Sequence, residues 1–178
     1  LQCREDLVEL PETSPEIVAL KQELSRMMIG SHPEFNKLAD RYLTLDDLLS
    51  VRSRLIGSGR IGGKAAGMLL ARRILLKERG EGDFAELMEE HDSFYVGSDV
   101  FFTFLVNNNL FRLRLQLSRS SQISREEFEE VERRFLAGTF PTEILNQFGE
   151  MLDYFGQAPI IVRSSSLLED SFGNAFAG

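Results

Sequence analysis

The stretch that decides the fold reads Gly57-Ser58-Gly59-Arg60-Ile61-Gly62-Gly63-Lys64, and good helix formers with a wide apolar face follow it. Glycine permits positive φ and a close approach of the backbone to a ligand. The start of a helix presents unpaired N–H groups and a partial positive charge, to which Lys64 adds a full charge. The stretch therefore predicts a phosphate site at the start of a helix. The alternative is a flexible loop between two helices.

Two well-known glycine patterns can be compared with this stretch. A Walker A loop fails twice, because Ser58 stands where its first glycine is needed and Ala65 stands where Ser or Thr should follow the lysine. The dinucleotide fingerprint G-x-G-x-x-G does match Gly57, Gly59 and Gly62. That fingerprint requires a preceding strand, and residues 50–56 carry two arginines and show little buried β character.

Outward from this stretch, capping residues and apolar periodicity predict a chain with more helices than strands. Phe101, Phe102 and Phe104 are expected to lie in the core, on one face of a helix. Helices are expected after the Ser14-Pro15 start, over 34–42, after Thr44, from Lys64 to about 77–82, from a Ser98 cap to 107, from Ser124 to about 137, and over about 142–155. Short buried strands are expected over 93–96 and 158–162.

Two strands do not make an independent sheet. We therefore expect a helix-rich α+β chain that is the front part of a larger domain. Residues 1–50 are expected to form an N-terminal arm with helices, and residues 51–178 the first part of the domain.

Composition narrows the functional classes. The 178 residues are 43% hydrophobic and carry a net charge of −8, which excludes global disorder and argues against a general nucleic-acid binder. No apolar run is long enough to span a bilayer, and no secretory signal is visible. The single cysteine, Cys3, excludes an internal disulfide, and His32 and His91 lack ligand spacing, so no metal site is expected. A reducing, cytoplasmic compartment is the default expectation.

Two further segments near the end of the chain could carry chemistry. Val162-Arg163-Ser164-Ser165-Ser166 would place a cation and several hydroxyls at the end of a strand, where Arg can pair with phosphate oxygens. The alternative is a polar turn whose serines cap a helix. Glu169-Asp170 could orient an arginine or help to hold a metal through water, or could form an ordinary solvated turn.

Taken together, these motifs resemble a known family. Three segments resemble the nucleotide-binding domain of phosphoenolpyruvate synthase and pyruvate phosphate dikinase. They are Gly62-Gly63-Lys64-Ala65-Ala66-Gly67-Met68, the segment Val162 to Asp170 with its V-R-S-S-x-x-x-E-D pattern, and Phe176-Ala177-Gly178. Tyr95-Val96-Gly97-Ser98 also resembles a strand ending that lies between these motifs in that family. The resemblance covers about residues 55–178, and the first 50 residues show no family motif.

The resemblance implies an ATP-grasp fold and a set of nucleotide-binding residues. Gly62, Gly63 and Lys64 would hold the nucleotide phosphates, with Lys64 as the phosphate-binding lysine. Arg163, beside Ser164, would contact the phosphates as a catalytic residue, and Gly178 would begin a loop that covers them. The role of Glu169 and Asp170 stays open between orientation and structure.

The resemblance also implies ATP and Mg²⁺ as cofactors, with the Mg²⁺ ligands outside this chain. The parent reaction would pass a phosphoryl group from ATP through a histidine in another domain to pyruvate, releasing AMP and phosphate. Neither His32 nor His91 lies in such a histidine motif, so this chain alone is expected to be inactive. Two alternatives are a non-catalytic nucleotide-binding or interaction module and a dinucleotide-dependent oxidoreductase, which would need a strand ahead of Gly57.

Overall fold

A computed structural model gives the structure of the chain. It describes residues 11–30, 32–78, 87–88, 92–119, 122–164, 170–171 and 174–175. Helices dominate these residues, with two small two-stranded sheets, so the expectation of a helix-rich α+β chain is confirmed. Within the described ranges, no helix combines the length and the apolar composition that crossing a membrane requires.

Among the residues that the structure describes, three helices precede the glycine stretch, and the starts of two of them follow from side-chain capping. They are α2 (Pro15–Met28), α3 (Pro33–Tyr42) and α4 (Leu45–Ser53). The Ser14 side chain accepts a hydrogen bond from the backbone N–H of Ile17 at the start of α2. At α4, the Thr44 side chain accepts from the N–H of Asp47, and the Asp47 carboxylate accepts from the N–H of Thr44. These predicted starts are therefore confirmed.

A short parallel β-α-β unit carries the glycine stretch. Strand β1 (Leu55–Ile56) leads through the glycines into α5 (Gly63–Glu78), and β2 (Tyr95–Val96) pairs with β1 in parallel. The expectation of little β character before Gly57 was wrong, because both residues of β1 are buried. The two arginines that argued against a strand lie just before β1, on α4 (Arg52) and at its end (Arg54).

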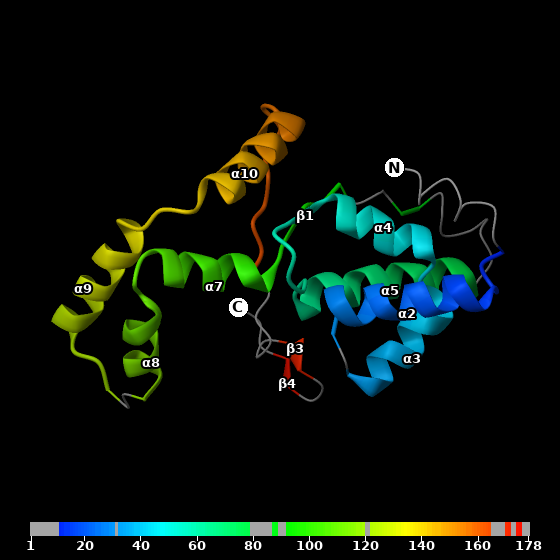
Figure 1. Ribbon diagram of the computed structural model, residues 1–178, viewed down its shortest axis with the longest axis horizontal. Coiled ribbons are helices and arrows are strands. Elements are labelled where there is room, and N and C mark those ends of the chain that lie inside the picture. The colour runs from blue at the N-terminus through cyan, green and yellow to red at the C-terminus, as the bar shows by residue number, and fades with distance from the viewer. Residues whose placement is uncertain are drawn as a thin grey trace.

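In the described ranges after β2, four helices form an arm on one side of the molecule (Figure 1). They are α7 (Ser98–Asn107), α8 (Phe111–Arg119), α9 (Arg125–Leu136) and α10 (Thr142–Phe155). The sequence reading missed α8 and placed the α7 cap at Ser98, whereas Gly97 is the cap residue. The Asn108 side chain donates to the carbonyl of Thr139 and accepts from its N–H, which ties the end of α7 to the segment before α10.

Two apolar clusters hold these parts together. The first joins α2, α3 and α4 to β1 and the start of α5; its buried members are Met28, Ala39, Leu43, Leu48, Val51, Leu55, Ile61 and Ala66. The second joins β1, α7 and α10 through Ile56, Val100 and Ile144. The glycine stretch therefore runs between the two clusters, because Ile56 precedes it and Ile61 lies inside it.

The predicted buried strand over 158–162 was wrong. This segment has no regular secondary structure, and the side chains of Ile161 and Val162 are 88% and 89% exposed. A run of β-branched apolar residues favours a buried strand, but a strand forms only where a neighbouring strand is available to pair with it. In the part of the chain that the structure describes, the strand pairs are β1–β2 and the antiparallel hairpin of β3 (Asp170–Ser171) and β4 (Asn174–Ala175).

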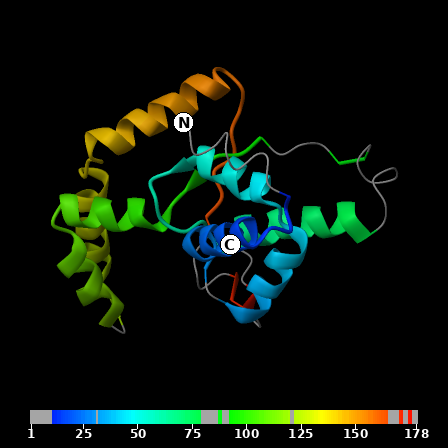
Figure 2. The same cartoon turned by 45° about the vertical axis from the view of Figure 1, so that its right-hand side comes forward.

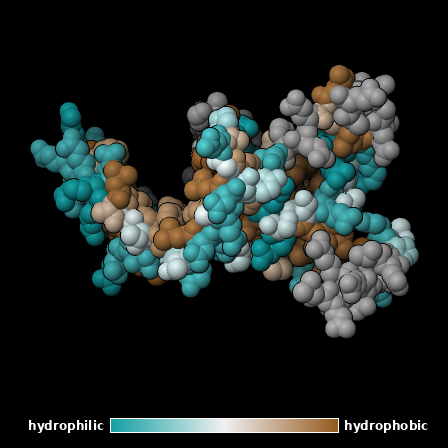
Figure 3. Space-filling view, turned by 90° about the horizontal axis from the view of Figure 1, so that it is seen from above, coloured by the Kyte–Doolittle hydropathy of each residue, from teal (hydrophilic) through white to brown (hydrophobic). Residues whose placement is uncertain are grey.

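Other apolar side chains also reach the surface. Phe101 and Phe102 were expected in the core but are each 46% exposed. Phe104 instead packs near Phe135 and Phe140. Figure 3 shows apolar side chains at the surface on this side of the molecule. Phe101 and Phe102 are thus apolar residues of α7 that are not buried, which helical periodicity alone does not reveal.

Candidate functional site

The residues predicted to hold phosphate lie at the start of α5. The N–H of Ala66 donates to the carbonyl of Gly62 at 3.1 Å, so Gly62 caps the helix and Gly63 and Lys64 are its first two residues. The N–H groups of a helix's first turn have no partner within the helix, and they carry the positive end of its dipole. No acidic residue lies in the first turn of α5, and the half-buried Lys64 adds a positive charge. This helix start is suited to an anion.

The glycines before this helix start hold an anion that belongs to the chain itself. Asp99, in the first turn of α7, directs its carboxylate at the segment Ser58–Gly59. The N–H of Gly59 donates to Asp99 Oδ1 at 2.7 Å, and the N–H of Ser58 donates to Asp99 Oδ2 at 2.9 Å. The Ser58 hydroxyl donates to the same Oδ2 at 3.1 Å. The sequence reading missed Asp99; its available signal was an acidic residue directly after a Gly-Ser pair at a helix start.

Three glycines make room for this carboxylate. Gly57 has φ +83°, which favours glycine, and a Cβ at Gly57 would lie 2.8 Å from Asp99 Oδ1. A Cβ at Gly59 would lie 2.6 Å from Asp99 Oδ1, and one at Gly97 would lie 2.5 Å from it. Gly57 and Gly59 of the dinucleotide fingerprint thus surround a side chain of the chain itself. Although β1 supplies the strand that the oxidoreductase alternative required, these two glycines already have another role.

The charge state of Asp99 follows from the same contacts. Burial alone would raise the pKa of its carboxyl group, but hydrogen bonds from the N–H groups of Ser58 and Gly59 and from the Ser58 hydroxyl outweigh burial, so the pKa lies below its ordinary value. Asp99 is therefore ionised at neutral pH. Its negative charge is matched by backbone donors.

The glycine stretch is anchored at further points. The N–H of Gly57 donates to Oε1 of Gln147 on α10 at 2.7 Å, and the N–H of Ile61 donates to the carbonyl of Met28 on α2 at 2.7 Å. The Ser98 hydroxyl accepts from the N–H of Arg60 at 3.2 Å. Because α2, α7 and α10 all hold it, the stretch is a positioned connection and not the flexible loop of the alternative reading.

Arg163 and Ser164 lie in the exposed segment that follows α10. Figures 1 and 2 show this segment descending from α10 past the start of α7 toward the region where α5 begins. Further along, the backbone of β3 lies beside α5. The remaining predicted residues, Ser165, Ser166, Glu169 and the Phe176-Ala177-Gly178 segment, lie outside the described residues.

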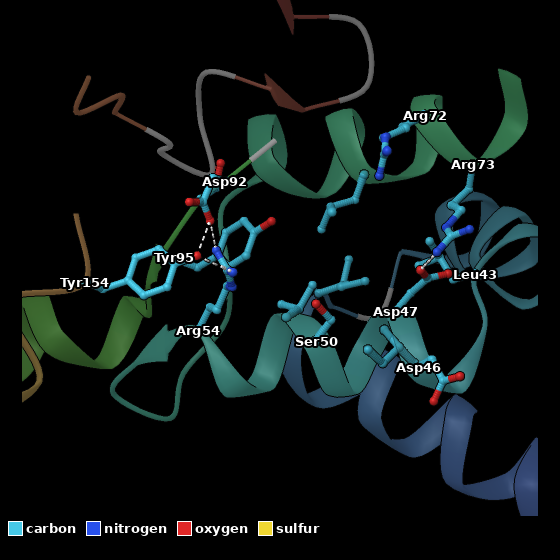
Figure 4. Close-up of a pocket in the computed structure, with 15 residues that line it drawn as sticks. Leu43, Asp46, Asp47, Ser50, Arg54, Arg72, Arg73, Asp92, Tyr95 and Tyr154 are labelled. Carbon is cyan, nitrogen blue, oxygen red and sulfur yellow. Dashed lines mark hydrogen bonds and ion pairs between the residues drawn. The ribbon is translucent and has the colours of Figure 1, made fainter. Parts of the chain in front are cut away.

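A cavity of about 580 Å³ lies elsewhere, between α4, α5 and the beginning of β2 (Figure 4). Neither Lys64 nor Arg163 lines this cavity. Because parallel β1 and β2 both begin beside it, the cavity is at the opposite end of the strands from the glycine stretch. Ligands of parallel sheets bind at the carboxyl ends of the strands, which here is the end that carries the glycine stretch.

Ion pairs join residues that line this cavity. Arg54 donates to the Asp92 carboxylate and to the Tyr154 hydroxyl, and its guanidinium lies 5.0 Å from the Tyr154 ring. The hydrogen bond with Asp92 raises the pKa of Arg54 and lowers that of Asp92. At the other end, Arg73 of α5 pairs with Asp47 of α4 (Figure 4). These pairs join neighbouring elements, which is a structural role.

Metal ligands do not cluster in the described part of the chain. No three His, Cys, Asp or Glu side chains come together there as a metal site requires.

Comparison with known proteins supplies the family. A family model described as pyruvate phosphate dikinase, AMP/ATP-binding domain, matches residues 58–178. No curated protein and no solved structure matches the chain. The match begins within the glycine stretch and includes Lys64, Asp99 and Arg163, so the resemblance seen in the sequence motifs is confirmed. Because it covers more than half of the chain, the chain belongs to the family of the AMP/ATP-binding domain of pyruvate phosphate dikinase.

Proposed function

We propose that this chain binds ATP at the start of α5 and supplies the nucleotide site of a dikinase-type phosphotransferase. The observation that carries the proposal is that Lys64 is the second residue of α5, directly after two glycines and with no acidic residue in the first turn. Backbone N–H groups and the lysine together favour a polyphosphate. The family's description as an AMP/ATP-binding domain supports the nucleotide as ligand.

In this proposal, each predicted residue has a defined task. Gly62 and Gly63 let the phosphates approach the backbone, and Lys64 offsets their charge. Arg163, beside Ser164, reaches the phosphates from the segment after α10 and stabilises charge that develops during transfer. The path of that segment toward α5 supports this assignment (Figure 1). Gly178 begins a covering loop, and Mg²⁺ is bound by residues outside the chain.

The finer reaction is also a proposal. In forming AMP, ATP loses two phosphoryl groups: one passes to a histidine in another domain and then to pyruvate, and the other passes to water and is released as phosphate. The same proposal includes three further points: residues 1–50 form an N-terminal arm and residues 51–178 the first part of the nucleotide-binding domain, the domain has an ATP-grasp fold, and the protein is cytoplasmic. All of them rest on the family resemblance.

Binding can be tested by titrating MgATP into the full-length protein and into its Lys64→Ala and Arg163→Ala variants, using calorimetry. A hydrogen bond to a charged group contributes about 1.5–3 kcal/mol to a binding free energy. Each variant should therefore bind MgATP roughly 10- to 100-fold more weakly. Lys37→Ala is a matched control, because Lys37 is exposed on α3 and pairs with Glu34. Wild-type affinity in both site variants would refute the assignment of Lys64 and Arg163.

The reaction can be tested separately by phosphorus NMR of the full-length protein with MgATP, with and without pyruvate. AMP, phosphate and phosphoenolpyruvate together would support the full proposal. AMP without phosphoenolpyruvate would retain the dikinase chemistry but require another acceptor. MgATP binding with no turnover in either condition would favour a non-catalytic nucleotide-binding module.

A further inference from the structure

We infer that Asp99 is a positioning residue for the nucleotide site: its carboxylate holds the glycine stretch and thereby sets where α5 begins and where Lys64 lies. The inference rests on the proposed function, namely that the start of α5 binds the phosphates of ATP. Asp99 itself is not assigned any contact with the nucleotide.

The first step of the argument is the density of contacts between two short segments. Residues 58–60 and residues 98–99 are joined by five hydrogen bonds: three to the Asp99 carboxylate, one from the N–H of Arg60 to the Ser98 hydroxyl, and one from the N–H of Ser98 to the carbonyl of Arg60 at 2.9 Å. This pairing fixes the glycine stretch on the first turn of α7.

The second step concerns the distance along the chain from this hydrogen-bonded pairing of residues 58–60 with residues 98–99, called the clasp below, to Lys64. Three residues separate Arg60 from Lys64. The first of them, Ile61, is buried in the same apolar cluster as Ala66 of α5, and its N–H is bound to Met28. Few residues are therefore available to absorb a displacement of residues 58–60, so such a displacement would be transmitted to the start of α5.

The third step is that the clasp requires a carboxylate. Both oxygens of Asp99 accept hydrogen bonds, Oδ1 from Gly59 and Oδ2 from Ser58. The side chain of Asn has the same shape, but its NH₂ group would face an N–H donor whichever way the amide is turned. Space is equally restrictive, because a Cβ on Gly57, Gly59 or Gly97 would come within 3 Å of the carboxylate oxygen Oδ1. Asp99→Asn thus breaks the clasp without changing side-chain volume.

The test compares Asp99→Asn with a variant that destabilises the protein elsewhere. Leu105→Ala is suitable, because Leu105 is fully buried on α7 but makes no hydrogen bond to the glycine stretch through its side chain. Asp153→Asn, an exposed change on α10, controls for loss of charge. In the full-length protein, thermal unfolding gives stability, and calorimetry at a temperature where every variant is folded gives the MgATP dissociation constant.

A positioning role predicts that Asp99→Asn weakens MgATP binding about tenfold, whereas Leu105→Ala, at an equal or larger drop in melting temperature, changes it less than twofold. Amine acetylation read by mass spectrometry gives a second readout. MgATP should protect Lys64 from acetylation in the wild type and in Leu105→Ala. In Asp99→Asn, this protection should be lost.

The outcomes separate the two proposals. If the wild type does not bind MgATP, the proposed function fails, and this inference fails with it. If the wild type binds but Asp99→Asn binds equally well, or if Leu105→Ala weakens binding as much, only the positioning role is overturned. If Asp99→Asn does not fold, Ser58→Ala decides, because it removes a hydroxyl that donates to Asp99 Oδ2 and leaves the backbone donors in place; an unchanged dissociation constant in Ser58→Ala would overturn the role.

Discussion

The backbone N–H of Gly59 donates a hydrogen bond of 2.7 Å to the carboxylate of Asp99, a residue 40 positions further along the chain. The contact joins the loop after β1 to the first turn of the helix after β2. It gives a glycine of an apparent dinucleotide fingerprint a purely intramolecular role. The phosphate site that we propose lies at the next glycines, Gly62 and Gly63, where α5 begins.

Gly59→Ala should destabilise the protein, because its Cβ would lie 2.6 Å from Asp99 Oδ1 and 2.7 Å from the Asp99 backbone nitrogen. Overpacking of this kind costs about 1–3 kcal/mol in the free energy of unfolding. Gly149→Ala in α10 is the matched control, since nothing lies within 4 Å of its added Cβ, and should stabilise by up to about 1 kcal/mol. Urea denaturation measures both, and equal effects would contradict the close packing around Asp99.

The pH dependence of stability should report on Asp99. Its pKa in the folded protein is lowered, so its contribution is present above the unfolded-state pKa of about 3.9 and is lost as pH falls through the lower folded value. The difference in unfolding free energy between wild type and Asp99→Asn should therefore stay constant from about pH 5 to 7 and shrink below about pH 4. Denaturant titrations across this range measure it. A difference that does not change with pH would show that the carboxylate's charge is not what stabilises the clasp.

Thr44→Ala should lower the free energy of unfolding by about 1 kcal/mol, because it removes the side-chain acceptor at the start of α4. The helix it caps contributes Leu48 and Val51 to the main apolar cluster. Ser124→Ala removes the equivalent acceptor from α9, which has no buried residue. Fraying of α9 should therefore cost less in global unfolding. Chemical denaturation compares the two variants, and a larger loss for Ser124→Ala would contradict the assigned burial.

Ile161→Ala in this chain should change stability by less than about 0.5 kcal/mol, because its side chain is 88% exposed. Leu105→Ala should cost about 2–5 kcal/mol, because it leaves a cavity at a fully buried position. Both changes remove an aliphatic side chain of the same size, so thermal unfolding of the two variants isolates burial. A cost above 2 kcal/mol for Ile161→Ala would restore the buried strand that the sequence predicted.

Much of the helical framework was predictable because its signals are local. Ser14, Thr44 and Ser124 each cap a helix within three residues of their own position, so the pattern that predicts the helix also makes its hydrogen bond. The glycines before Lys64 predicted the start of α5 for the same reason. The strands were less predictable, because β1 and β2 are two residues each and exist only through each other.

The sequence by itself determined the starts of α2, α4 and α9 and the position of Lys64 near the start of α5, and its motifs carried the resemblance to the family. Only the tertiary structure decided that Asp99 fills the first glycines, that Leu55–Ile56 is a strand and that Ile161 is exposed. The physical reason is distance along the chain. Capping and helical periodicity act within a few residues, whereas a carboxylate placed among glycines, a strand pair and the burial of a side chain depend on which remote segments pack together.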